Sequence, residues 1–188
     1  MNKINESVRT AKALRSLYFT RAGFSVIWAT ALILSLKAHS PFANLLFIIY
    51  PLWDAVATWF DIKANPPESN KITQYINLGI GIAVTIAIAI ALGTGVPAAM
   101  MVIGGWASVT GLIQLILGLR RRKTFGGQWP MIISGGQSLL AGIVFIAMAH
   151  DPKMGINSLA GYALFGAFYF LLAAMRLTKY LNLLPRKS

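Results

Sequence analysis

The side chains that could do chemistry gather on two neighbouring apolar segments. Four polar side chains recur on the second segment at i, i+4, i+8 and i+11, one face of a helix: Tyr50, Asp54, Thr58 and Asp61. Arg21 and Ser25 form a matching polar stripe on the first segment. A carboxylate inside a membrane is costly and marks a functional candidate. Because Arg21 and Asp54 are expected at similar depths, the spacing predicts an ion pair between Arg21 and either Asp54 or Asp61.

Three interpretations of this pair are open: a structural link between the first two helices, a site for a solute or proton, or an Asp54 at the membrane surface. Further polar residues fall at the same depth on later segments: Gln74, Asn77, Gln114, Ser134, Gln137 and Ser138. The far halves of two segments, 86–92 and 139–148, are purely apolar. A polar vestibule open to one side of the membrane would give this pattern, and so would interhelical hydrogen bonds.

The amino-acid composition indicates the class of fold that positions these residues. Of 188 residues, 56% are hydrophobic and 12% are charged, and the mean hydropathy is +0.64, whereas soluble domains carry about 25% charged residues. A membrane-crossing helix needs about 20 apolar residues. Six segments meet that length, and we expect an all-α membrane protein forming one transmembrane domain over 1–188, with spans at Tyr18–Lys37, Phe42–Asp61, Thr73–Leu92, Pro97–Gly118, Pro130–Ala149 and Asn157–Arg176.

The basic residues predict the orientation of these helices. Fifteen of the 17 Lys and Arg residues lie at the end of the bundle that carries both termini, and only Lys37 and Lys153 lie at the other. The excess marks the cytoplasmic side. The run Arg120–Lys123 is interpreted as an anchor on anionic lipid headgroups, not as a nucleic-acid contact. The five tryptophans are interpreted in part as interfacial belt residues.

An internal repeat underlies the six segments. Gly23, Gly79 and Gly136 are spaced by 56 and 57 residues. On the even segments, the pairs 54–55, 110–111 and 165–166 recur at 56 and 55. The spacing predicts three parallel-repeated helical hairpins, about 18–61, 73–118 and 130–176, around a pseudo-threefold axis along the membrane normal.

Small residues in these helices are expected to let backbones approach closely. The candidate helix-packing positions are Gly23, Gly79, Ala83, Gly111, Gly136, Gly142 and Gly166. Packing within the chain and a homo-oligomer interface are both open.

Four stretches resemble the HdeD-like acid-resistance membrane proteins: residues 51–55, 106–120, 131–144 and 162–171, with Ala55 where glycine is usual in that family. The resemblance covers about Arg21 to Lys179 and rests on glycine spacings in apolar helices. It implies a bacterial inner-membrane protein linked to acid resistance, with both termini cytoplasmic as the charges predict. It transfers no catalytic residue.

Other chemistry has few candidates. His39 and His150 are the only histidines, and both are predicted on the outer face, where they would sense acid or be incidental. The chain has no cysteine and no catalytic or metal-binding motif, so neither an enzyme nor a cofactor is expected. Two functions are open: a non-enzymatic protein that supports envelope integrity or acid and stress tolerance, alone or through a membrane partner, and a channel or carrier for a small solute or proton.

Overall fold

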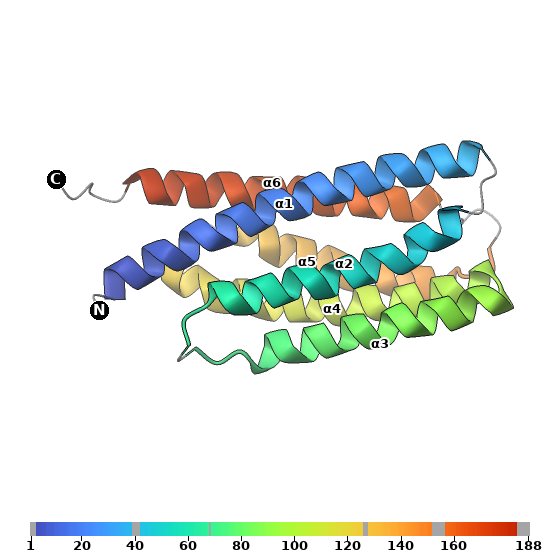
Figure 1. Cartoon of the computed structure of the whole chain (residues 1–188), viewed down its shortest axis with the longest axis horizontal. Helices are drawn as coiled ribbons and strands as arrows, with labels where there is room; N and C mark the ends of the chain where they lie inside the picture. The colour runs from blue at the N-terminus through green and yellow to red at the C-terminus, as the bar shows by residue number, and fades with distance from the viewer. Residues whose placement is uncertain (1–2, 39–41, 68, 126–127, 152–156, 184–188) are drawn as a thin grey trace.

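The computed structural model describes residues 3–38, 42–67, 69–125, 128–151 and 157–183. Across these residues the chain forms six helices (Figure 1): α1 Lys3–Lys37, α2 Phe42–Ala64, α3 Ile72–Thr94, α4 Val96–Phe125, α5 Trp129–Ala147 and α6 Asn157–Leu183. Each is long and apolar enough to cross a membrane. The expectation of an all-helical membrane protein with six spans is confirmed at this level.

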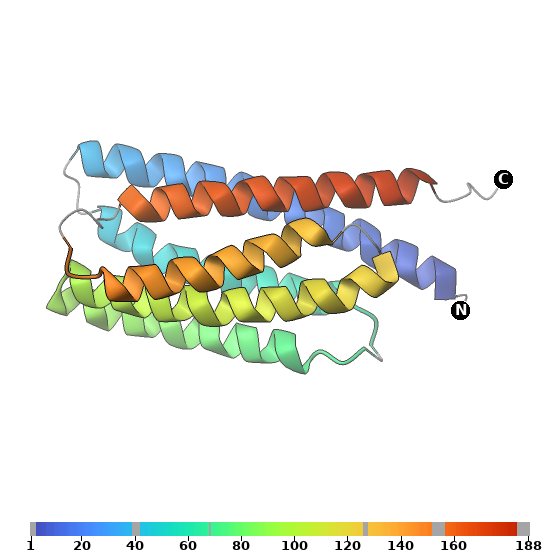
Figure 2. The same ribbon diagram turned by 180° about the vertical axis from the view of Figure 1, so that it is seen from behind.

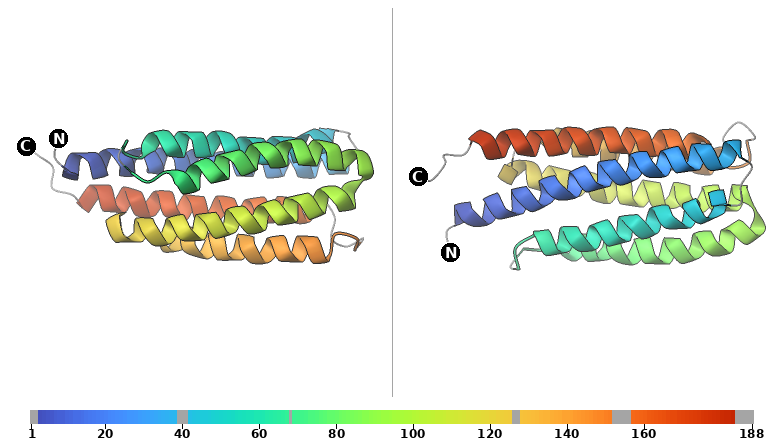
Figure 3. Two further views of the ribbon diagram at one scale, coloured as in Figure 1. Left: turned by 90° about the horizontal axis from the view of Figure 1, so that it is seen from below. Right: turned by 45° about the horizontal axis from the view of Figure 1, so that its top comes forward.

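The helices run along one common axis and alternate in direction, so both termini lie at the same end of the bundle (Figure 1). Each helix contacts its neighbours in chain order, and α6 returns to pack against α1, which closes a ring. Figures 2 and 3 show α1 and α6 side by side from further directions. The most extensive contacts join α4 to α5, α1 to α6 and α2 to α3, while the two helices within each predicted hairpin touch less.

Three helices extend by seven residues or more beyond their predicted spans at the end that carries the termini. α1 begins at Lys3 instead of Tyr18, α4 continues to Phe125, and α6 continues to Leu183. The extensions of α1 and α6 pack together through an apolar cluster at this end of the bundle that includes Ala11, Leu14 and Leu177. This tertiary contact supports helix beyond the apolar windows of α1 and α6, which is why hydropathy alone made these two predicted spans too short.

A glycine ladder brings α4 and α5 into backbone contact. Gly104 and Gly111 on α4 face Gly142 and Gly135 on α5, and the residues on each helix are seven apart. A Cβ added at Gly111 would lie 2.6 Å from the amide nitrogen of Leu139, and one at Gly135 would lie 2.7 Å from the Gly111 carbonyl oxygen. The packing roles expected for Gly111 and Gly142 are confirmed, and Gly104 and Gly135 add to them.

The glycines that mark the repeat do not pack in this way. A Cβ added at any of Gly23, Gly79, Gly136 or Gly166 would meet nothing within 4 Å, and Ala83 is exposed on α3. The packing role predicted for these five positions is therefore wrong within one chain. Their spacing was read correctly from the sequence, but a repeat does not say which side of a helix faces a neighbour.

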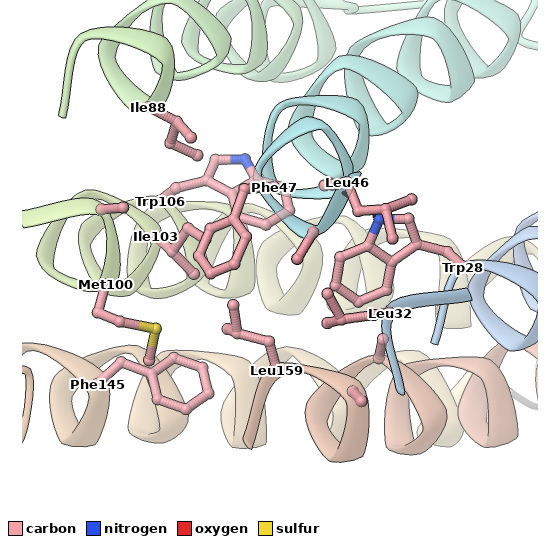
Figure 4. Packing of buried hydrophobic residues seen from close by; sticks show 14 of the residues in the cluster. Trp28, Leu32, Leu46, Phe47, Ile88, Met100, Ile103, Trp106, Phe145 and Leu159 are labelled. Atoms are coloured by element: carbon pink, nitrogen blue, oxygen red, sulfur yellow. Dashed lines mark hydrogen bonds between the residues drawn. The ribbon is translucent and has the colours of Figure 1, made fainter. Parts of the chain in front are cut away.

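An apolar cluster fills the end of the bundle opposite the termini. Large side chains from all six helices meet there (Figure 4), among them Trp28, Phe47, Ile88, Met100, Phe145 and Leu159. The indole N–H of Trp28 donates to the Leu46 carbonyl at 2.8 Å, so its polar atom is satisfied inside the cluster. At the same end, Gly95 turns the chain between α3 and α4 with φ 133°, a conformation that side chains disfavour.

The glycine ladder generates a matched pair of variants. Gly135→Ala places a methyl group against the α4 backbone and should lower the free energy of unfolding by about 1–3 kcal/mol, the usual range for overpacking. Gly136→Ala, one residue away, has open space and should be neutral or slightly stabilising. The measurement is unfolding in mixed detergent micelles. Equal effects of the two variants would contradict the contact.

Candidate binding cavity

A cavity of about 110 Å³ lies inside the bundle, between the apolar cluster and the end that carries the termini. All six helices contribute to its wall. Its polar lining comes from Tyr18, Arg21, Ser25, Tyr50, Asp54, Thr58, Asp61, Gln74, Asn77, Thr110, Gln114, Arg121, Ser134, Ser138 and Tyr162. The polar side chains predicted on the first two apolar segments therefore form one part of a single internal site.

The expected ion pair between α1 and α2 is confirmed. Arg21 Nη1 donates to Asp54 Oδ1 at 2.8 Å, and Nη2 donates to Thr58 Oγ1 at 3.3 Å. The guanidinium also lies 5.3 Å from the centroid of the Phe170 ring on α6. From α3, Asn77 Nδ2 donates to Asp54 Oδ2 at 3.2 Å and to Thr58 at 2.7 Å. The network joins α1, α2 and α3, and its aromatic contact reaches α6.

A second ion pair was not predicted. Arg121 Nη2 donates to both oxygens of Asp61, at 2.6 and 2.8 Å, and Nη1 donates to the Tyr18 hydroxyl at 3.3 Å. The side chains of Arg121 and Asp61 are 11% and 10% exposed. The interpretation of 120–123 as a headgroup anchor is wrong for Arg121, whereas Arg120, Arg122 and Lys123 are exposed.

The local sequence explains why these side chains meet. The four polar residues of α2 share a face through their helical spacing, and all four line the cavity. On α6, Tyr162, Gly166 and Phe170 are four residues apart and line it together. Because Gly166 has no side chain on this face and an added Cβ would meet nothing within 4 Å, it leaves room in the cavity.

One member of the predicted polar cluster lies elsewhere. Ser25, Thr58, Asn77 and Gln114 line the cavity as expected, but Gln137 is exposed on α5. Ser134 and Ser138 hold the inner face of that helix, and Gln137 is about a quarter turn away from them at 3.6 residues per turn. The prediction that Gln137 faces the same polar cluster is therefore wrong.

Two tryptophans interpreted as belt residues also belong to the cavity wall. Trp53 stands next to Asp54, and Trp106 lies deep in α4. A tryptophan far from both ends of a predicted span was the sequence signal for Trp106. The other aromatic residues of the wall are Tyr18, Tyr50, Tyr162 and Phe170.

Four buried polar atoms of the lining residues lack hydrogen-bond partners within the part of the chain that the structure describes. They are the donors Trp53 Nε1 and Trp106 Nε1 and the acceptors Gln74 Oε1 and Asn77 Oδ1. Trp106 and Gln74 are only 5% and 4% exposed. An unpaired polar atom in an apolar medium is costly. Side-chain adjustment towards water or a small polar solute in the cavity would satisfy these groups.

A second polar pocket of about 350 Å³ adjoins the cavity and shares Gln74, Leu117 and Arg121 with it. Its other walls come from the start of α1, the end of α4 and the segment between α2 and α3, including Glu6, Asn65 and Asn70. The cavity is therefore continued by polar groups towards the end of the bundle that carries the termini, with the Arg121–Asp61 pair at the boundary.

The histidines do not join this site. His150 is exposed at the opposite end of the bundle, and His39 lies outside the described residues. Across 3–38, 42–67, 69–125, 128–151 and 157–183, no three His, Asp or Glu side chains gather closely enough to hold a metal ion.

Together the fold and the site describe an all-helical chain whose six helices are long and apolar enough to span a membrane and surround an internal polar cavity. Comparison of the chain with protein-family models, with curated proteins and with solved structures finds no match.

The first ion pair is testable by a double-mutant cycle. Asp54→Asn strands the buried Arg21 charge and should destabilise the protein by about 3–5 kcal/mol, as for other broken buried pairs. The double change Arg21→Gln/Asp54→Asn should cost less than Asp54→Asn alone. Detergent unfolding midpoints measure both. Simple additivity of the two single changes would show that the groups are not coupled.

Proposed function

We propose that this protein is a carrier or gated channel that binds small polar solutes in its central cavity. The observation that supports it best is a polar cavity bounded by all six helices, with buried donors and acceptors that have no partner in the described residues. A bundle with a purely structural role in envelope integrity or stress tolerance has no need of such a space, because dry helix packing is more stable.

The two ends of the cavity differ, which favours a carrier or gate over an open pore. Towards the termini the lining continues into the second polar pocket, past the Arg121–Asp61 pair. In the other direction, Trp28, Phe47 and their neighbours form the apolar cluster. Passage of a polar solute then requires that this cluster separate, since apolar contacts offer it no hydrogen bonds.

We propose a non-enzymatic function for the same site. Both carboxylates of the lining, Asp54 and Asp61, are held in ion pairs with arginines and accept further hydrogen bonds. Neither is placed as a free general base. Membership of the HdeD-like family, with its link to acid resistance, stays an expectation from the sequence motifs.

The orientation and the finer symmetry are also proposals. The excess of Lys and Arg at the end that carries the termini supports a cytoplasmic location for both termini, in a bacterial inner membrane. The ring of helices, with less extensive contacts inside each hairpin than between hairpins, supports three hairpin repeats around a pseudo-threefold axis. Anionic headgroups are the proposed partners of the exposed cations Arg120, Arg122 and Lys123.

The absence of cysteine makes the orientation directly measurable. We expect a membrane-impermeant maleimide to label Lys153→Cys in cells whose inner membrane is intact. Arg122→Cys and Lys187→Cys should react only after that membrane is opened. The reverse pattern would overturn the orientation.

Blocking the cavity tests the proposed function. Gly166→Leu directs four carbon atoms into the cavity without a backbone conflict, whereas Gly79→Leu adds the same atoms on the exposed face of α3. In proteoliposomes, fluxes of a panel of small neutral and charged solutes should fall to the protein-free level with Gly166→Leu and persist with Gly79→Leu. Equal fluxes in the two variants, with equal yields of reconstituted protein, would contradict transport through the cavity.

A further inference from the structure

We infer that the solutes taken by the cavity are uncharged molecules of about four non-hydrogen atoms that both donate and accept hydrogen bonds, such as small amides. This inference rests on the proposed function and narrows it to a substrate class. It follows from the charge, the hydrogen-bonding groups and the volume of the cavity.

The charges of the lining cancel locally. Only four lining residues are charged at neutral pH, and they form two pairs, Arg21 with Asp54 and Arg121 with Asp61. Every carboxylate oxygen of the two aspartates already accepts at least one hydrogen bond. An ion that enters therefore meets no unneutralised counter-charge, while it gives up its hydration, which is the costliest step for a small ion in an apolar medium.

The aromatic wall does not favour a cation either. Trp53 stacks on Phe24 with ring centroids 4.4 Å apart, and Tyr50 packs on Trp28 at 4.3 Å. The Phe170 ring already has the Arg21 guanidinium over it. One face of each ring is thus occupied, and Arg21 would repel a second cation from this part of the wall.

The unpartnered atoms belong to residues of the cavity wall, and after adjustment of these side chains towards the cavity they fit a neutral polar molecule. The indole N–H groups of Trp53 and Trp106 need an acceptor, and the amide oxygens of Gln74 and Asn77 need a donor. A molecule with one carbonyl and one or two N–H groups supplies both kinds of group without adding charge. A purely accepting anion or a purely donating cation would leave half of these atoms unsatisfied.

The volume of the cavity limits the size of the solute. A cavity of about 150 Å³ holds a benzene molecule, so the space of about 110 Å³ found here holds a smaller one. Urea and acetamide, with four non-hydrogen atoms each, are of the expected size. Sugar alcohols such as mannitol are far too large.

Three planar probes of nearly the same shape separate charge from size: urea is neutral, guanidinium carries one positive charge, and nitrate carries one negative charge. Uptake of each into proteoliposomes is measured with the membrane potential clamped at zero, and the uptake seen with Gly166→Leu is subtracted. We expect urea uptake to exceed guanidinium and nitrate uptake by at least about tenfold, and mannitol uptake to be absent. Guanidinium or nitrate uptake equal to that of urea would overturn the substrate class but leave transport standing. Failure of every probe to distinguish the native chain from Gly166→Leu would overturn both.

Variants that change the charge of the cavity test the same inference independently. Asp54→Asn leaves Arg21 without its counter-charge, so the ratio of nitrate to urea uptake should rise several-fold. Arg21→Gln/Asp54→Asn restores a neutral cavity and should return the ratio to the native value. Where Asp54→Asn fails to reconstitute, Asp61→Asn leaves Arg121 uncompensated and makes the same test. An unchanged ratio in the single variants would overturn the claim that charge balance selects the solute.

Discussion

The absence of water from the membrane interior is the constraint on which this structure depends. A polar side chain at that depth that finds no partner inside the bundle costs free energy. Two ion pairs avoid this cost, Arg21 with Asp54 and Arg121 with Asp61, and both carboxylates stand on α2. α2 is thereby linked by charge to α1 and α4. Its contact with α1 is among the less extensive in the ring, so the polar link holds a pair of helices that apolar packing holds weakly.

Two different kinds of contact hold the bundle together. Glycines and alanines bring neighbouring hairpins together, as in the Gly111–Gly135 contact of α4 and α5 and the Ala55–Gly81 contact of α2 and α3. Polar side chains, in contrast, point into the space that the ring encloses. Close backbone packing around the ring leaves the centre to side chains of mixed size, and a small residue there, Gly166, leaves the centre partly empty. The cavity is therefore a consequence of where the small residues lie.

The parts of this arrangement that depend on local spacing were predictable from the sequence. Apolar runs located all six helices, and helical periodicity placed Arg21 opposite Asp54. The parts that depend on tertiary contact were not. Arg121 lies beyond the predicted end of its span at Gly118, yet α4 continues to Phe125 and turns that arginine inward. For Gln137 and Gly79, spacing along the chain could not tell which face of the helix meets a neighbour, and both are exposed. The position of a residue along its own helix follows from the sequence, whereas the face of that helix that meets a neighbour is decided by how the other five helices pack.

The closure of the ring by α1 and α6 also bears on how the chain is made. Synthesis proceeds from the N-terminus, so of the six helices α1 emerges before the others and its most extensive partner emerges last. Until then, Ala11 and Leu14, which are fully buried in the finished bundle beside α6 residues such as Leu177, have no α6 to cover them. The Arg21–Asp54 pair becomes available as soon as α2 follows, long before that closure. A charged link that is available this early would hold α1 and α2 together before α6 is present.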